Sequence, residues 1–380
     1  MGLFRKPVSI AGVLLAVAAT VATIAYLRMP PARPRPRAAP LDAAEQARLV
    51  SALAPPRRAR PVVAVVGDNA GSETTDYVIP FSVLRESGVA DVHALATGPG
   101  PLALYPALTI EPHSTTSEFD ARFPEGADYV VVPALQHPEA PLVVAWIRGQ
   151  RAKGATVVGI CAGVMTLAAA GLVDGRAATT HWYYLDDLRE RHPTMRWARD
   201  RRYVADRGVV TTTGITASIP VSLALVEAIA GRERAAAVAE SLGVASWDAS
   251  HDSDAFGLDR RGLATVVRNR GAFWRHETLA LPVEPGVDEL AVALTADPYS
   301  RTYRSRAVTV ARAGGPVLTR RGLRLLPDRV GSTADLPPVA PAHPARALDT
   351  ALVAIANRYG ASTADFVAMQ MEYPGRWERR

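Results

Sequence analysis

The chain has 380 residues, of which 48% are hydrophobic and 21% are charged, and its formal net charge is +6. This composition is that of an ordinary globular protein and excludes a largely disordered chain. The length allows one complete α/β domain and a second, smaller unit. The single cysteine, Cys161, excludes disulfide bonds within the chain and leaves any thiol chemistry to one sulfur atom.

The amino-terminal segment carries a localisation signal. Residues Val8–Leu27 form an uncharged stretch, preceded by Arg5 and Lys6, that is long enough to cross a membrane as a helix. A cleaved signal peptide is the alternative, but its apolar region is normally shorter and is followed by a small-residue cleavage site, whereas Arg28 follows here. We therefore expect residues 1–28 to be a single-pass membrane anchor. The charges on its two sides leave open which side of the membrane holds the soluble part.

Residues 29–60 are rich in proline and arginine and predict an extended tether, with a short helix at 41–53. Much of the excess positive charge lies in this segment, and arginines next to a membrane bind anionic lipid head groups. The sequence has no zinc-finger spacing and no convincing helix-turn-helix. Membrane lipid is therefore an expected partner, and nucleic acid is not.

From residue 61 the chain alternates between short apolar runs and helical patterns. The predicted strands are 62–66, 92–96, 129–132 and 156–160, with two more around a turn at 206–208, and the predicted helices are 76–87, 141–153, 165–171 and 219–230. Such alternation is typical of a mainly parallel sheet that is covered on both faces. We expect residues 61–231 to form one α/β domain.

The rest of the chain has a different pattern. Strand-like runs predict a smaller α+β appendage over residues 232–335. These runs are 278–283, 290–295, 307–311 and 323–326. A proline-rich linker at 336–344 and a helix at 345–359 predict a last unit over residues 336–380. No internal repeat is evident in the sequence.

Cys161 lies where a strand turns into a helix. It follows the apolar run Thr156–Ile160, and the small residues Ala162 and Gly163 then open a helical pattern. Such an elbow holds a nucleophile in strained backbone geometry beside the first free N–H groups of the helix. Those groups and the helix dipole are expected to lower the pKa of the thiol and make the sulfur nucleophilic. A buried, inert cysteine is the alternative.

The residues around the elbow resemble a known family. The segments GICAGVMTLA (159–168), AGLVDGR (170–176) and TTHW (179–182) are similar to the ThiJ/PfpI superfamily of class I glutamine amidotransferase-like proteins. Two further segments agree in the right order, DYVIP at 76–80 and TTGITASIP at 212–220. The closest resemblance is to the domain fused to AraC-type transcriptional regulators. It spans about residues 61–231 and implies a flavodoxin-like three-layer sandwich.

The resemblance implies two catalytic residues. Cys161 is the expected nucleophile, and Asp76 stands at the position of the acidic residue that touches the sulfur, with the superfamily's spacing to Pro80. A carboxyl group beside a thiol in a partly dry pocket has a raised pKa and can pass a proton to the sulfur or to a substrate. The alternative role of Asp76 is a helix N-cap, and Glu73 in the polar loop after the first strand is then the candidate acid.

Other residues are expected to line the pocket. Gly159 and the N–H groups of Ala162 and Gly163 are expected to stabilise a developing anion. Thr216 lies in the matched TTGITASIP segment and is expected in the pocket. In the subgroup that the chain resembles, the TTHW segment lies at the strand–helix junction after the elbow helix, so His181 is expected to be structural or pocket-lining. No Cys–His–Glu triad of the amidotransferase type is evident. Glutamine hydrolysis is therefore not expected.

These residues support three hypotheses. The first is a membrane-anchored cysteine hydratase or hydrolase, in which Cys161 attacks a small electrophile such as an isonitrile, an aldehyde or an amide while Asp76 moves the proton. The superfamily's isonitrile hydratases pair a cysteine with an aspartate in this way. The second is a small-molecule or redox sensing module that lacks its own DNA-binding domain, and the third is an inactive scaffold.

The sequence predicts no cofactor and no metal. The expected partners are a small-molecule ligand or substrate, membrane lipid through the N-terminal helix, and a second copy of the chain, since dimerisation is common in the superfamily.

Overall fold

The computed structural model describes residues 29–375 apart from residues 32, 34–37 and 340–341. At its centre is a seven-stranded sheet in the order β11-β12-β8-β7-β1-β3-β6. Its strands are parallel to their neighbours except β11, which is antiparallel to β12. The strands are β1 (Val62–Gly67), β3 (Asp91–Ala96), β6 (Ser114–Thr115), β7 (Tyr129–Val132), β8 (Thr156–Gly159), β11 (Tyr203–Asp206) and β12 (Val209–Thr212).

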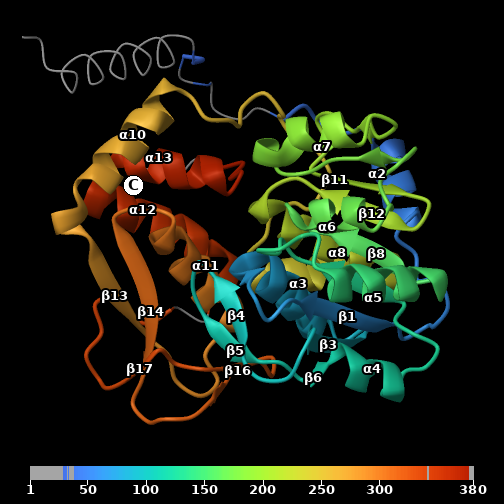
Figure 1. The fold of residues 1–380 in the computed structure, drawn as a ribbon, viewed down its shortest axis with the longest axis horizontal. Coiled ribbons are helices and arrows are strands. Elements are labelled where there is room, and N and C mark those ends of the chain that lie inside the picture. The colour runs from blue at the N-terminus through green and yellow to red at the C-terminus, as the bar shows by residue number, and fades with distance from the viewer. Residues whose placement is uncertain (1–28, 32, 34–37, 340–341, 376–380) are drawn as a thin grey trace, which may run out of the picture.

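Helices cover both faces of this sheet (Figure 1). Helix α3 connects β1 to β3, and α5 connects β7 to β8 in the opposite direction along the sheet, so right-handed crossovers place them on opposite faces. Helix α8 packs against α3, and α6 packs against α5. The predicted α/β fold with a mainly parallel sheet is confirmed. The helices are α3 (Thr74–Ser87), α4 (Thr116–Arg122), α5 (Pro141–Ala152), α6 (Gly163–Ala169), α7 (Leu185–Arg191), α8 (Ser218–Ala230) and α9 (Arg232–Leu242).

Burial explains why the sequence forms these central elements. All six residues of β1 are buried, because a parallel strand in the middle of the sheet has helices on both faces. Helix α3 is buried on nearly every side, from Thr74 to Leu84, because it packs against the sheet, α8 and a helix of the C-terminal part. The carboxylate of Glu73 caps its first turn by accepting a hydrogen bond from the N–H of Asp76. A polar N-terminus of α3 is thereby placed inside the molecule, hydrogen-bonded to Ala134 in the segment after β7.

The C-terminal part adds a further β-α-β unit and three outer helices. Its parallel sheet has the order β13-β14-β17. These elements are β13 (Glu277–Pro282), α11 (Glu289–Ser300), β14 (Ser305–Ala311), β17 (Arg329–Val330), α10 (Arg260–Gly271), α12 (Ala347–Tyr359) and α13 (Ala361–Gln370). Figure 1 shows this part beside the α/β domain, with α11 next to α3.

A further sheet, in the order β15-β16-β5-β4-β2, joins the two parts of the chain. It combines β2 (Ser72–Glu73), β4 (Leu102–Tyr105) and β5 (Thr109–Glu111) with β15 (Val317–Leu318) and β16 (Arg324–Leu325). The remaining short elements are α2 (Ala43–Ser51), β9 (Ala177–Ala178), β10 (Arg196–Trp197) and the 3₁₀ turns η1 (Trp182–Tyr184), η2 (Ile215–Ala217), η3 (Phe273–Arg275) and η4 (Pro344–Arg346). Buried side chains from both parts form a large shared hydrophobic core, and Ala280, Val308 and Val310 form a small separate cluster. The predicted boundary at residue 231 stays a prediction.

One predicted strand is wrong. Residues 290–295 lie inside helix α11, which Asp288 caps through the N–H of Ala291. The helix packs against α3, α12 and β14, so apolar residues are needed around most of its surface. The period that marks an amphipathic helix is therefore absent from the sequence. The predictions at 278–283, 307–311 and 345–359 correspond to β13, β14 and α12, whereas α13 was not predicted.

The predicted membrane location needs correction. In the part of the chain that the structure describes, no helix has both the length and the apolar character to span a bilayer. The stretch 8–27, on which the prediction depended, lies outside the described residues. Arginines at the end of the predicted tether bind protein instead: Arg57 and Arg58 both pair with the buried carboxylate of Asp128.

Candidate active site around Cys161

Cys161 lies at the sharp turn between β8 and α6. Its backbone φ angle is +55°, in the left-handed region that non-glycine residues rarely adopt. The N–H of Cys161 donates to Thr212 Oγ1 at 3.0 Å, and its carbonyl accepts from Thr180 Oγ1 at 3.0 Å. Such a conformation costs on the order of 1–3 kcal/mol and persists only where surrounding contacts enforce it. Two threonine side chains supply that enforcement here.

Two glycines allow the elbow to pack closely. A Cβ atom on Gly163 would lie 2.2 Å from the carbonyl oxygen of Val132, and one on Gly159 would lie 2.9 Å from a Leu167 methyl carbon. The N–H of Gly163 donates to Ile160 O at 2.7 Å, so it is already used within the turn. The N–H of Ala162 faces the thiol and favours its ionised form. The structure thus gives the glycines a packing role and directs one N–H group to the sulfur.

The thiol of Cys161 is buried, with 5% of its surface exposed. Burial raises its pKa well above the ordinary value, and the nearby carboxyl groups of Asp76, Glu73 and Glu372 raise it further. The N–H of Ala162 acts in the opposite direction but is outweighed. The predicted lowering of the thiol pKa is therefore wrong in direction, because carboxyl groups and burial outweigh the end of a seven-residue helix. Near neutral pH the sulfur carries its proton.

Asp76 lies in the first turn of α3 with its side chain fully buried. Its Oδ2 accepts from the N–H of Ala134 at 3.2 Å, whereas its Oδ1 has no hydrogen-bond partner among the described residues. Burial raises the pKa of this carboxyl from 3.8 to about 7. Asp76 therefore exchanges a proton near neutral pH, and one of its oxygens is available to do so.

Glu73, not Asp76, is the N-cap of α3. Its Oε2 accepts from the N–H of Asp76 at 2.5 Å, and the hydroxyl of Thr75 lies within hydrogen-bond distance of both carboxylate oxygens. Burial raises the pKa of Glu73, as do Asp76 and Asp297, while Arg301 opposes them. The alternative role considered for Asp76 thus belongs to Glu73, which leaves Asp76 without a capping function.

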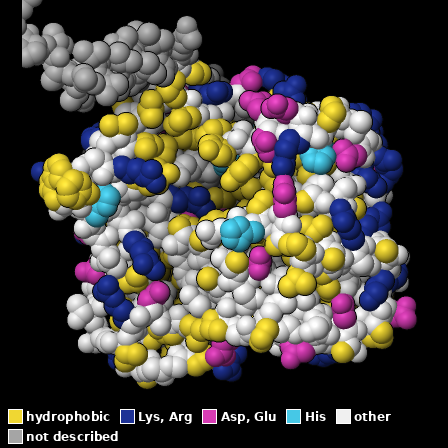
Figure 2. Space-filling model, viewed as in Figure 1, with side chains coloured by type: hydrophobic (Ala, Val, Ile, Leu, Met, Phe, Trp, Pro, Cys, Tyr) yellow, Lys and Arg dark blue, Asp and Glu magenta, His cyan; other side chains and the backbone are white. Residues whose placement is uncertain are grey.

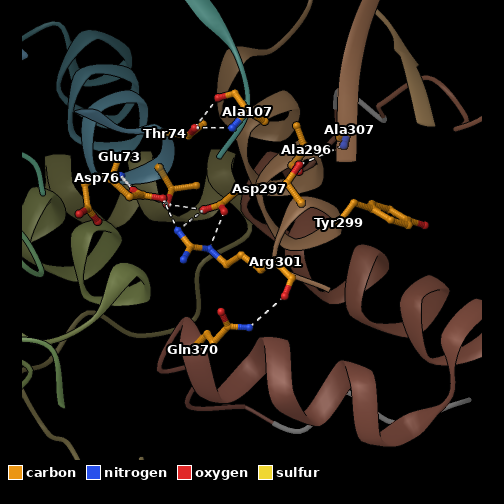
Figure 3. Close-up of polar contacts among 12 residues, drawn as sticks. Glu73, Thr74, Asp76, Ala107, Ala296, Asp297, Tyr299, Arg301, Ala307 and Gln370 are labelled. Carbon is orange, nitrogen blue, oxygen red and sulfur yellow. Dashed lines mark hydrogen bonds and ion pairs between the residues drawn. The ribbon is translucent and has the colours of Figure 1, made fainter. Parts of the chain in front are cut away.

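Three residues of the site were missed from the sequence: Asp297, Arg301 and Glu372. Arg301, at the end of α11, donates from Nη2 to Glu73 Oε1 at 2.7 Å and from Nε to Asp297 Oδ1 at 2.5 Å (Figure 3). Burial opposes the charge on Arg301, but Asp297 and Glu73 outweigh it and raise its pKa. Three carboxyl groups and one guanidinium thus meet beside the thiol. Glu73 and Arg301 are 228 positions apart, so no local motif could have shown this pair.

The C-terminal segment closes another side of the site. His181 accepts from the N–H of Tyr183 at Nδ1 and donates from Nε2 to the carbonyl of Gln370, at 3.1 and 2.9 Å. Both ring nitrogens are thus occupied by backbone groups, and burial lowers the pKa of the histidine. Thr216 donates from Oγ1 to the carbonyl of Glu372 at 2.6 Å, so it holds the same segment.

Glu372 belongs to this closing segment and is itself buried. Its backbone φ is +51°, and its carboxylate accepts from the N–H of Trp182 and pairs with His251. Figure 2 shows a hollow on this face of the molecule, between the α/β domain and the C-terminal helices, in which hydrophobic side chains gather. Among the residues that the structure describes, no group of three or more His, Cys, Asp or Glu side chains is arranged to hold a metal ion.

Comparison with known proteins identifies the family. The model of the DJ-1/PfpI family matches residues 62–228. The isonitrile hydratase of Pseudomonas putida is 31% identical over 167 residues, which are 42% of this chain and 68% of the hydratase. The Parkinson disease protein 7 homolog of Danio rerio is 30% identical over 174 residues, 44% of this chain and 89% of that protein.

A transcriptional regulator and a crystal structure are also similar to this chain. The HTH-type transcriptional regulator CdhR of Pseudomonas aeruginosa is 32% identical over 142 residues, so the chain spans 41% of the regulator's length. The crystal structure of Drosophila melanogaster DJ-1beta is 23% identical, with a TM-score of 0.44, and covers 49% of this chain and 100% of that one. The resemblance seen in the sequence is confirmed: the chain belongs to the DJ-1/PfpI family.

Proposed function

We propose that the protein is a cysteine-dependent hydratase that adds water to a small electrophilic carbon, with isonitriles as the substrate class. The observation that supports it most directly is the Asp76 carboxyl, which is buried beside the thiol and has one oxygen without a partner among the described residues. Its pKa of about 7 allows it both to take and to give a proton at neutral pH.

The chemistry needs a nucleophile and a proton at the same carbon. Cys161 Sγ forms a bond to the isonitrile carbon, while the thiol proton passes through Asp76 to that carbon and gives a thioimidate. Water then adds to the same carbon, the carbon–sulfur bond breaks, and the thiol regains its proton as an N-substituted formamide leaves. The sum is one isonitrile and one water converted to one formamide, with no oxidant or reductant.

The electrostatics of the site suit this order of events. A thiolate alone offers no proton, whereas a protonated thiol next to a base offers both the sulfur and the proton. The raised pKa of Cys161 keeps the proton on the sulfur until the substrate arrives, and the N–H of Ala162 then favours the negative charge that develops there.

Turnover of a small alkyl isonitrile tests the proposal directly. Formamide production by the full chain is expected. Asp76→Asn is expected to reduce the rate roughly 10²- to 10⁴-fold, the usual contribution of a positioned proton donor, and Cys161→Ser is expected to reduce it at least as much because it removes the nucleophile. Asp288→Asn, which changes a cap on a different helix, should leave the rate unchanged. Formamide formation that survives both site variants would reject the mechanism.

A small-molecule sensing module is the second candidate. The closing segment favours it, because Gln370 and Glu372 tie the site to the C-terminal helix, and a ligand near Cys161 can therefore alter contacts at the surface. Redox sensing is less well supported, since the raised thiol pKa keeps the sulfur in its less oxidisable form. Saturable isonitrile binding without formamide would favour sensing.

A further inference from the structure

The C-terminal part repeats the architecture of the first third of the α/β domain. Residues 62–115 form β1, α3, β3, β4, β5 and β6 in this order, apart from the short β2. Residues 277–330 form β13, α11, β14, β15, β16 and β17, the same kinds of element in the same order. We call these the first unit and the second unit.

The strand pairing of the two units also agrees residue by residue. Equivalent residues differ in number by one constant offset. Strands β4 and β5 pair Leu102 with Ile110, and β15 and β16 pair Val317 with Leu325. The N-caps of α3 and α11 are Glu73 and Asp288 at the same offset. Further equivalent contacts are Leu95–Ser114 with Val310–Arg329, Leu104–Leu108 with Thr319–Leu323, and Ala94–His113 with Thr309–Asp328. The register of β13 on β14 differs by one residue from that of β1 on β3.

The two units pack against each other about an approximate two-fold axis. Strand β5 pairs antiparallel with β16, and Ile110 lies opposite Leu325, its own equivalent. Helix α3 packs against its equivalent α11. Hydrogen bonds cross this contact at both ends, from Ser82 Oγ to Glu289 Oε1 and from Thr75 Oγ1 to Asp297 Oδ2. A second copy of the chain could reach this face of α3 only by displacing α11.

An arginine closes each end of the α3–α11 contact. At one end Arg301 binds Glu73, the cap of α3, next to Cys161. At the other end Arg321 binds Asp288, the cap of α11, together with Glu86 and Glu289. The two ends are alike in charge and burial, but only the first adjoins a cysteine.

We propose that Arg301, supplied by the second unit, is a positioning residue of the Cys161 site: its guanidinium holds Glu73 in place and balances the carboxyl groups that surround the thiol. Arg301 takes part in no chemical step, which is left to Cys161 and Asp76. It acts through the charge of its neighbours, so the site is complete only when the second unit is docked on the first.

The geometry gives Arg301 this role because its side chain bonds directly to two of the carboxyl groups beside the thiol. Its guanidinium makes hydrogen bonds to Glu73 and Asp297 while its own side chain is 18% exposed. Arg301 favours the ionised form of Asp76, and Asp297 opposes it. The titratable and charged groups that surround Asp76 and the thiol are Glu73, Tyr105, Cys161, Tyr184, Asp297, Arg301 and Glu372.

The rate at which a small uncharged reagent modifies Cys161 at pH 8 tests the proposal in the full chain. The signal has a single source, because the chain holds one cysteine. Arg301→Gln is expected to slow modification about tenfold, since removal of a nearby positive charge disfavours the thiolate by roughly one pKa unit or more. Asp297→Asn is expected to accelerate it, because it removes a negative charge from the same cluster.

The two variants are expected to change the modification rate in opposite directions, which distinguishes a positioning role from a general loosening of the fold. A loosened contact exposes the thiol and accelerates modification in both variants, so faster modification of Arg301→Gln would overturn the proposal. Arg321→Gln is the matched control, because it breaks the equivalent end of the same contact and should leave the rate within about twofold of the unaltered chain. If Arg301→Gln does not fold, Asp297→Asn must still react faster than Arg321→Gln, and equal rates would overturn the proposal. Neither result depends on isonitrile turnover, so the test stands apart from the proposed function.

Discussion

The first and second units share a framework but differ in what they bury. At the position of Asp76 the second unit has Ala291, at the same place in the first turn of the equivalent helix. The first unit is followed by the remaining strands of the α/β domain and by the Cys161 elbow, whereas no elbow cysteine follows the second. One unit therefore carries the chemistry, and the other supplies a packing partner and an arginine.

This difference separates residues kept for folding from residues kept for chemistry. A helix N-cap and a paired hairpin appear in both units, so they are requirements of the fold. A fully buried carboxyl with an unpartnered oxygen appears in the first unit, and burial of such a group opposes stability unless it is protonated. Its place beside the thiol is therefore better explained by function than by packing.

The largest effect is expected where the two units meet. Ile110 and Leu325 are buried opposite each other near the approximate two-fold axis, so replacement of either by alanine should lower the free energy of unfolding by about 2–5 kcal/mol. Because facing side chains on paired strands touch, the double variant should lose less than the sum of the two. Urea denaturation of the four proteins measures this.

The control for that cycle pairs Leu325→Ala with Ile147→Ala. Ile147 is equally buried but lies in α5, away from the contact between the units. Its effect should add to that of Leu325 within about 0.5 kcal/mol. Additive losses for Ile110 and Leu325 as well would contradict direct contact at the axis.

A second, somewhat smaller effect should follow from the buried carboxyl of the first unit. Because burial raises the folded-state pKa of Asp76 to about 7, the folded state binds a proton more tightly than the unfolded state. Its favourable contribution is fully present below pH 4 and is lost as the pH rises to 7, with a total change of up to about 4 kcal/mol. Asp76→Asn should remove this dependence and raise the free energy of unfolding at pH 8, as measured by denaturation at pH 5 and pH 8.

The equivalent position in the second unit provides the comparison for this pH effect. Ala291→Ser changes the residue there without adding a titratable group, so its pH dependence should match that of the unaltered chain. A pH dependence that persists in Asp76→Asn would assign the titration to another group, of which Glu73 is the first candidate because its pKa is also raised by burial.

The sequence predicted what local motifs determine. The strands β1, β3, β7 and β8 were predicted because buried parallel strands are continuous apolar runs, whereas the short elements between residues 97 and 128 were not predicted. The approach of Cys161 to Asp76 was expected from the resemblance, and the structure places both in one buried cluster. The direction of the thiol pKa was predicted incorrectly, since the burial and the charges that raise it come from segments far from the elbow.

There are physical reasons why the sequence did not show the contribution of the second unit to the site. Helix α11 is apolar on most sides and lacks the period of an amphipathic helix, so it was assigned as a strand. The two units share few identical residues at the constant offset, among them Gly100 with Gly315 and Pro112 with Pro327. Register and pairing, which carry the similarity, are properties of the backbone. The sequence around Arg301 therefore contains nothing that indicates its place in the Cys161 site.

The smallest effect, and the sharpest comparison, concerns the two helix caps. Glu73→Ala and Asp288→Ala each remove the side chain that accepts an N–H from the first turn of a helix, α3 in one case and α11 in the other. Loss of a cap lowers stability by about 0.5–2 kcal/mol, so both variants should unfold slightly more easily by thermal denaturation. The rate of Cys161 modification should change only for Glu73→Ala, and it should increase, because a carboxyl that opposes the thiolate has been removed. An equal change of rate in Asp288→Ala would show that the thiol responds to the packing of the two units and not to the charge of Glu73.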